Sequence, residues 1–222
     1  MKYILYFSAI LLSFSSCVQP GCDFNGGYLF ERPATLSPAQ STYHIGDTIT
    51  ISSTFSDNVY ERETERTYLL ENFNFYPGTG FCRLDTVGID TIEMVTTDHF
   101  DFIIGPEYDY RLFISSFDGA VLEGQFNYEN EFYDLEYKLV VKKPGLYLTQ
   151  FGTFLDQFGQ KQDFPGKCNG QGVNSWTVIN EGSDNNAEFL LEAVDSAWHR
   201  LYNDRLDNDF HKLGGYCFKV EK

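Results

Sequence analysis

The chain has few basic residues and none of the short motifs that mark common catalytic or metal sites. Lysine and arginine number 16 against 32 aspartates and glutamates, and the four histidines form no HExxH pair. CxxC, GxSxG and a glycine-rich phosphate loop are also missing. Nucleic-acid phosphates are bound mainly by Lys and Arg. The sequence therefore excludes general nucleic-acid binding and offers no motif for a metal or a cofactor.

The apolar run at the N-terminus is too short to serve as a permanent transmembrane helix. Ile4–Leu12 is almost continuously apolar, whereas a helix that crosses the hydrocarbon core needs roughly 20 such residues. Lys2 precedes the run, and Ser15 and Ser16 follow it. This order is typical of a secretory leader that is removed after export.

Phe14-Ser15-Ser16-Cys17 resembles the lipobox of Bacteroidetes-type bacterial lipoproteins, a looser form of the usual box with Leu at the first position and Gly or Ala at the third. The resemblance implies that residues 1–16 are the leader and that Cys17 carries the acyl chains. Since Val18, not Asp, follows the cysteine, it also implies the bacterial outer membrane, with the protein facing the periplasm or the surface. The alternative is an ordinary leader that leaves Cys17 available for a disulfide.

An acylated Cys17 leaves four cysteines in an oxidising compartment: Cys22, Cys82, Cys168 and Cys217. An even number predicts two disulfides. Of the three connectivities we favour Cys22–Cys82 with Cys168–Cys217, which keeps each bridge within one half of the chain. Each would close a loop of roughly 50–60 residues, worth about 4 kcal/mol.

Alternating apolar residues predict a mainly β fold. Thr48–Phe55 alternates with period two, and similar segments follow at the short intervals of a sandwich or barrel, including His99–Ile104 and Tyr133–Val141. Lys142–Gly145 is expected to turn the chain into a hairpin with Leu146–Phe151. The Gly-Asp turn before Thr48 resembles immunoglobulin-like modules of bacterial surface proteins, so we expect an immunoglobulin-like β-sandwich. The charged stretch Ser56–Thr67 is expected to be an exposed loop.

One C-terminal helix should pack on a sheet. Asn185 and Glu188 form a capping-box pattern, and apolar residues from Ala187 to Leu201 then recur at helical spacing. The predicted organisation is a leader at 1–16 and a lipidated tether at 17–42 with an edge strand at Gly27–Phe30. A β-sandwich at 43–154 follows, and then a β-α-β region at 155–222 that either continues this domain or forms a second one.

Two groups of polar residues could be read as chemical sites, but neither matches the pattern that such a site requires. Asp204–Asp209 offers carboxylates for calcium but lacks the glycine of an EF-hand loop. His99 and Asp101 alternate onto what we expect to be the solvent face of a strand, so a general base there is disfavoured. No metal site is predicted.

The chain is rich in aromatic residues, with 21 Phe and 15 Tyr. Core packing accounts for most of them, and exposed rings would serve as stacking platforms for a glycan or a protein partner. The candidates are Tyr108, Tyr110, Tyr128, Tyr133 and Tyr147. The sequence therefore favours a lipid-anchored, non-catalytic binding or assembly module. The alternatives are an envelope carbohydrate-acting hydrolase, which needs paired carboxylates in a cleft, and a calcium-dependent adhesion module.

Overall fold

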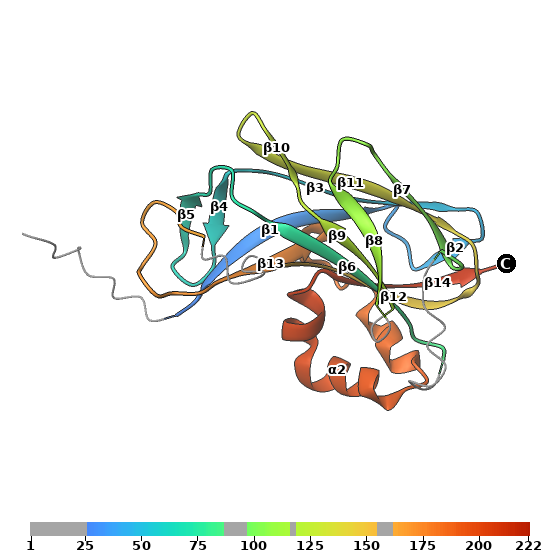
Figure 1. Ribbon diagram of the computed structural model, residues 1–222. Helices are drawn as coiled ribbons and strands as arrows, with labels where there is room; N and C mark the ends of the chain where they lie inside the picture. Colours follow the sequence, from blue (N-terminus) through green and yellow to red (C-terminus); the bar gives the residue numbers. More distant parts are fainter. Residues whose placement is uncertain (1–25, 87–96, 116–118, 155–161) are drawn as a thin grey trace, which may run out of the picture.

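Two β-sheets face each other in the structure, a computed structural model that describes residues 26–86, 97–115, 119–154 and 162–222 (Figure 1). The first sheet has the order β10-β11-β3-β1-β4-β5, with β13 also paired to β1 and β7 to β11. The second has the order β2-β14-β12-β6-β9-β8. A C-terminal helical segment packs against the second sheet. The predicted class, a mainly β immunoglobulin-like sandwich with one C-terminal α-helix on a sheet, is confirmed.

The strands are β1 (Tyr28–Ser37), β2 (Thr42–His44), β3 (Thr48–Ser56), β4 (Asn58–Glu61), β5 (Arg66–Leu69), β6 (Tyr76–Arg83), β7 (Phe100–Ile104), β8 (Tyr110–Ser115), β9 (Gly119–Gly124), β10 (Asn127–Glu129), β11 (Phe132–Val141), β12 (Gly145–Phe154), β13 (Val173–Ile179) and β14 (Gly215–Glu221). The helical elements are the 3-10 helices η4 (Asn180–Gly182) and η5 (Ala187–Glu192), the α-helix α2 (Ser196–Leu206) and the π-helical turn η6 (Asp207–His211).

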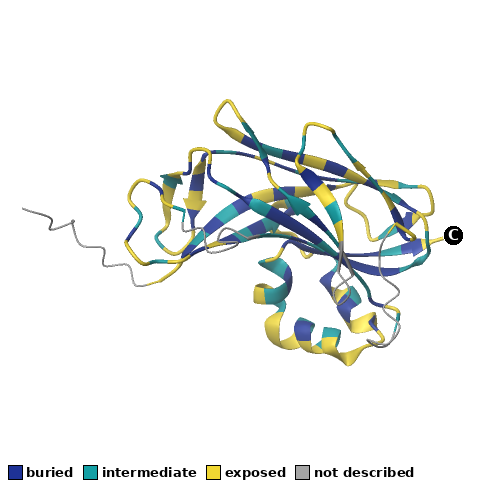
Figure 2. Cartoon of the chain, viewed as in Figure 1, coloured by how far each residue is buried: buried dark blue, intermediate teal, exposed yellow. Residues whose placement is uncertain are grey.

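Alternating burial explains why β3 and β11 form where the sequence predicts them. Ile49, Ile51 and Phe55 point into the sandwich from β3, and Tyr133, Leu135, Tyr137, Leu139 and Val141 do so from β11. The two strands pair antiparallel, with Tyr137 opposite Ile51. Each large apolar side chain buried here contributes roughly 1.5–3 kcal/mol. Figure 2 shows this alternation of buried and exposed residues along the strands.

Strand β12 is buried on both faces, which places it at the centre of the molecule. Tyr147 and Phe151 point between the sheets, whereas Leu146 and Leu148 point the other way. On that outer side they meet a second apolar cluster, which includes Leu190, Leu201 and Phe210 of the helical segment. The helical segment thus covers the outer face of the second sheet.

The expected continuous helix from Asn185 is broken in two. Asn185 and Asn186 both have positive φ, at 56° and 57°, and no side chain caps η5. The chain is extended again at Ala193, and α2 begins after Asp195, whose carboxylate accepts a hydrogen bond from the Ala197 amide at 2.8 Å. Asp195 is therefore the N-cap that the sequence interpretation assigned to Asn185.

The first and last of the described strands, β1 and β14, lie inside the sheets. Gly27–Phe30 was expected to be an edge strand, but β1 has neighbours on both sides, β3 and β13 among them. The predicted 155–222 region supplies one strand to each sheet: β13 pairs parallel with β1, and β14 lies between β12 and β2. Strands from the predicted regions 17–42, 43–154 and 155–222 are therefore interleaved.

The expected hairpin between β11 and β12 does not form. β11 pairs with β3, β7 and β10 in the first sheet, whereas β12 pairs with β6 and β14 in the second. Lys142–Pro144 thus crosses between the sheets. Gly145, the first residue of β12, has a positive φ of 158°. The predicted turn at the Pro-Gly pair is not formed: the chain only bends at Lys143 and passes from one sheet to the other.

The predicted loop Ser56–Thr67 contains a short hairpin, because β4 pairs antiparallel with β5. Glu61, at the end of β4, is wholly buried. Its carboxylate accepts hydrogen bonds from the amides of Leu29, Glu63 and Thr64 at 2.6, 3.0 and 2.7 Å and from the Thr64 hydroxyl at 2.5 Å. Burial acts to raise the pKa of this carboxyl, but the hydrogen bonds outweigh burial and hold the pKa below its ordinary value.

A Glu61→Gln variant is therefore expected to lose about 2 kcal/mol of unfolding free energy at pH 7, since an amide replaces a charged acceptor. A lowered pKa stabilises the fold above the unfolded-state pKa of about 4.3, and this stabilisation disappears as the pH falls through the folded-state value. Urea unfolding at pH 7 and pH 3.5 should show the gap between parent and variant narrowing at the lower pH. An equal gap at both values would contradict an ionised Glu61.

The predicted disulfide pairs are wrong. Cys82 and Cys217 are both reduced, so neither Cys22–Cys82 nor Cys168–Cys217 forms. Both thiols lie opposite Leu148, on the two strands that flank β12. Cys168 instead lies near the start of β1, where its amide donates to the Tyr28 hydroxyl. Cys17 and Cys22 also lie outside the described residues.

Candidate ligand-binding cleft

The five candidate tyrosines do not form one surface. Tyr110, Tyr133 and Tyr147 are at most 5% exposed, so their proposed role as stacking platforms is wrong. They are core residues with satisfied hydroxyls; the Tyr133 hydroxyl, for example, donates to the Leu70 carbonyl. Tyr108 and Tyr128 are half-buried, and their hydroxyls donate to Asp134 and Asp57 at 2.6 and 2.9 Å.

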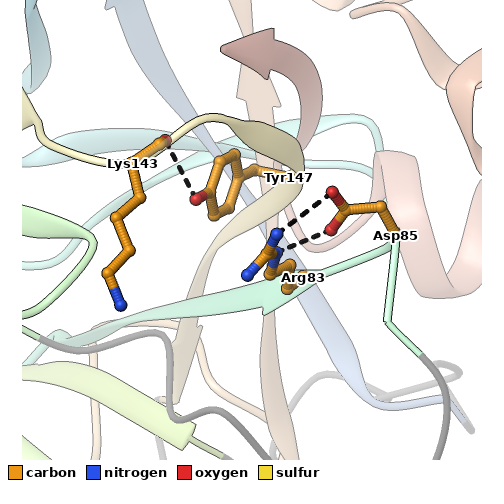
Figure 3. Close-up of polar contacts among 4 residues, drawn as sticks. All are labelled: Arg83, Asp85, Lys143 and Tyr147. Carbon is orange, nitrogen blue, oxygen red and sulfur yellow. Dashed lines mark hydrogen bonds and ion pairs between the residues drawn. The ribbon is translucent and has the colours of Figure 1, made fainter. Parts of the chain in front are cut away.

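Tyr147 belongs to a polar cluster at the crossing between the sheets (Figure 3). Its hydroxyl donates to the Lys143 carbonyl at 3.1 Å. Beside it the Arg83 guanidinium binds both carboxylate oxygens of Asp85, at 2.7 and 3.3 Å. The geometry is that of a bidentate ion pair, which fixes both side chains. We interpret this cluster as a structural support for the crossing.

The open site lies where the first sheet meets the helical segment. A cleft of about 410 Å³, which we call the Trp176 cleft, opens over the outer face of β13. It is lined by Glu31, Arg62, Trp176, Thr177, Val178, Ile179, Gly182, Asn185, Asp207 and His211. Its volume falls within the roughly 300–1,000 Å³ of small-ligand sites.

Three strands hold one wall of the cleft. Glu31 of β1 lies beside Trp176 of β13 in the parallel register. Arg62, just after β4, places its guanidinium carbon 4.3 Å from the centroid of the Trp176 ring and an Nη1 nitrogen 2.6 Å from Glu31 Oε2. The Arg62 amide also donates to the Leu29 carbonyl at 3.0 Å. The indole is therefore held by a cation–π contact, and the cation is held in turn by an ion pair.

The opposite wall belongs to the helical segment. Asp207 and His211 come from η6, which is docked to β13 by a hydrogen bond from the Thr177 amide to the Lys212 carbonyl at 3.0 Å. The Phe210 ring of η6 packs so closely on Gly215 that a Cβ there would lie 2.5 Å from it. Gly215 thus lets the turn approach the sheet and close this side of the cleft.

Sequence reasoning missed most of this site. The sequence interpretation placed Arg62 in an exposed loop and Glu31 in a tether, and it named neither Trp176 nor His211 as a site residue. Ser175 and Thr177 face inward on β13 and the larger Trp176 faces outward, an orientation that the alternation of the sequence does not decide. A smaller cavity of about 220 Å³ beside Tyr108 is lined mainly by Glu107, Glu136 and Lys138 and the neighbouring apolar residues.

The other chemical candidates do not assemble a site. Among the described residues no three His, Cys, Asp or Glu side chains gather closely enough to hold a metal ion, and Asp209 of the acidic turn is paired with Arg205 at 3.0 Å. His99 is wholly buried against the Tyr147 ring, not on the solvent face as expected. None of the helices in the described part of the chain has the length and apolar character needed to span a membrane.

No known family model and no curated protein sequence matches the chain. Among solved structures it is similar to a type II cohesin domain from the cellulosome of Acetivibrio cellulolyticus, with 12% identity over 56% of this chain and 74% of that one and a TM-score of 0.26. The second type II cohesin module of the ScaA scaffoldin from that organism gives 10% identity over 56% and 76%, with a TM-score of 0.28. The collagen-binding subdomain of the Enterococcus faecalis surface protein ACE gives 7% identity over 58% and 87%, with a TM-score of 0.23. The fold and the cleft described above rest on the strand pairing and contacts of this chain alone.

Proposed function

We propose that the chain is a lipid-anchored, non-catalytic binding module of the bacterial outer membrane that holds a short glycan in the Trp176 cleft. One observation carries the proposal. An outward-facing indole is fixed by Arg62 in a cleft of small-ligand size and is surrounded by polar side chains.

The cleft suits a sugar because it combines an aromatic ring with donors and acceptors. A pyranose ring has apolar C–H faces and a rim of hydroxyls, so it stacks on an aromatic side chain and needs both kinds of polar partner. Trp176 offers ring area and an indole N–H. Arg62 keeps 39% of its side chain exposed beside its ion pair with Glu31, and Asp207 supplies acceptor oxygens. A flat protein partner would need a broader surface.

Binding is favoured over hydrolysis by the state of the carboxylates. A glycosidase needs two carboxyl groups that face each other across the substrate, one of them protonated. The cleft has Glu31 and Asp207, but Glu31 is ion-paired with Arg62 at 2.6 Å. The ion pair positions Arg62 against the Trp176 indole. It also leaves the cleft without a second unengaged carboxyl group that could act as a general acid.

The tether between the proposed anchor and the first strand is short. Ten residues lie between Cys17 and Tyr28, the first residue of β1, so the Cα atoms of these two residues can be at most about 36–40 Å apart in a fully extended tether. Without residues 1–16 the chain has 15 basic and 32 acidic residues, a formal charge of −17, and so has no electrostatic attraction for anionic lipid. In the proposed arrangement the acyl chains alone supply membrane affinity.

A Trp176→Ala variant tests the cleft. Screening the purified full-length protein against an array of oligosaccharides should find a bound class, and titration calorimetry with the best oligosaccharide should show affinity falling about 30-fold in the variant, the loss typical of a central aromatic contact. Phe132→Ala is the matched control, because Phe132 is 51% exposed on β11 and does not line the cleft.

Two results would contradict the proposal. Absence of binding to every oligosaccharide would exclude the glycan. Equal affinity in the parent and the Trp176→Ala variant would place the glycan elsewhere on the molecule. A protein partner whose binding depends on Trp176 would keep the cleft as the site and replace its ligand.

A further inference from the structure

Arg32 occupies a position in the core where β1 otherwise places apolar side chains. Its inward neighbours are Phe30 and Ala34, and its side chain is wholly buried. The guanidinium carbon lies 5.2 Å from the Phe126 ring centroid and 5.4 Å from that of Phe151. The two rings contact the cation, but they accept none of its N–H groups in a conventional hydrogen bond.

Only one acceptor reaches this guanidinium among the described residues. Arg32 Nη2 donates to Thr177 Oγ1 at 2.6 Å, whereas Nε and Nη1 make no hydrogen bond. Burial lowers the pKa of Arg32 to about 9, which still leaves the group charged at neutral pH. A buried charge without a counter-charge is strongly unfavourable.

The buried carboxylates of the described chain are engaged elsewhere. Glu61 accepts from Leu29, Glu63 and Thr64, and Asp57 accepts from Tyr128. Neither forms an ion pair with Arg32. The positive charge therefore has no negative partner within the described core.

A chain of buried hydroxyl groups lies in the same part of the core. The Tyr137 hydroxyl donates to Thr79 Oγ1 at 2.6 Å, and Thr79 Oγ1 lies 2.8 Å from the Tyr110 hydroxyl. Tyr110 is close enough to Arg32 for the two groups to interact electrostatically, but they form no hydrogen bond with each other. If the Thr79 hydroxyl donates to the Tyr110 hydroxyl, the hydroxyl hydrogen of Tyr110 is left to donate to another group. This region then holds three donor groups without an acceptor, namely Arg32 Nε, Arg32 Nη1 and the Tyr110 O–H.

We propose that Arg32 and Tyr110 bind a small monovalent inorganic anion of the chloride class between the two sheets. One negative charge balances one guanidinium, and a single spherical acceptor can receive N–H and O–H donors together. A divalent oxyanion would leave excess negative charge in the core. Neither Arg32 nor Tyr110 lines the Trp176 cleft, and Thr177, whose hydroxyl accepts from Arg32, is the residue that the two sites share.

Thermal unfolding of the purified full-length protein tests the site. Samples are refolded and unfolded at constant ionic strength while chloride replaces gluconate from about 5 to 500 mM. Because an anion bound only by the folded state stabilises that state, Tm should rise by about 3–6 °C for each tenfold increase in chloride above its Kd. In an Arg32→Met variant, which keeps the length but lacks the charge, Tm should not depend on the anion.

Crystals grown in bromide provide a second measurement that does not depend on the folding of the variant. An anomalous peak within hydrogen-bond distance of Arg32 Nε or Nη1 would support the site. The proposal is overturned if the parent has the same Tm in chloride and gluconate, if Arg32→Met responds to chloride as the parent does, or if bromide-grown crystals show no peak beside Arg32.

Discussion

A Cys17→Ala variant is expected to leave the membrane fraction and appear among the soluble exported proteins. In the proposed function the Cys17 thiol carries the acyl chains, and each buried methylene contributes about 0.8 kcal/mol of membrane affinity. Two or three chains would make release negligible, whereas the acidic domain alone has no attraction for anionic lipid. Cell fractionation, together with the intact mass of the mature protein, measures both the location and the lipid increment.

Cys22→Ala is the matched control, because it removes a thiol five residues away and leaves the proposed lipid site intact. It should remain in the membrane fraction with a lipid-sized mass increment. Membrane retention of the Cys17→Ala variant, or an unmodified N-terminus in the parent, would refute the anchor and with it the assignment to the outer membrane.

A Phe218→Ala variant is expected to lose about 3–5 kcal/mol of unfolding free energy. Phe218 of β14 is wholly buried, and its ring is stacked on Tyr147 with a centroid distance of 5.5 Å and meets the edge of Tyr43 at 5.4 Å. Removing the ring deletes apolar burial and leaves a cavity between the sheets. Equilibrium urea unfolding should show a lower midpoint with an unchanged m-value.

Phe132→Ala serves here as an exposed control, since the same chemical change at 51% exposure should alter stability by no more than about 0.5 kcal/mol. Equal stability losses at Phe132 and Phe218 would contradict the assignment of Phe218 to the core.

Alternation predicted strands well wherever one face of a strand is buried. Thr48–Phe55 and Tyr133–Val141 were located correctly because the side-chain period of two exposes the pattern directly. The same reasoning failed for β4, because this four-residue strand buries Val59 and the charged Glu61 on the same face, so it shows no apolar alternation. The prediction of a single helix also failed. The helical spacing of apolar residues continues from η5 into α2, but the positive φ angles of Asn185 and Asn186 do not allow an α-helix to start there.

The contacts between segments that are distant in the sequence could not be predicted from the hydrophobic periodicity. The Trp176 cleft combines Glu31, Arg62, Trp176 and η6, and periodicity within any one segment carries no information about the other three. The disulfide error has the same cause: the pairs were chosen to keep each bridge within one half of the chain, but the sheet order places Cys82 and Cys217 on opposite sides of β12. Arg32 is a different case. Its position in the alternating pattern of β1 predicts a buried side chain, whereas its charge predicts an exposed one.

The parallel pairing of β1 with β13 has a consequence for how the protein is made. Arg32 and Thr177 are 145 residues apart in the chain yet adjacent in the sheet, and β14, which pairs with β12 and β2, ends one residue before the C-terminus. Contacts of such long sequence separation form late, because the intervening chain must first close on itself. A polypeptide that emerges N-terminus first therefore completes the first sheet only when Val173–Ile179 has been synthesised, and the second only when Gly215–Glu221 has been synthesised.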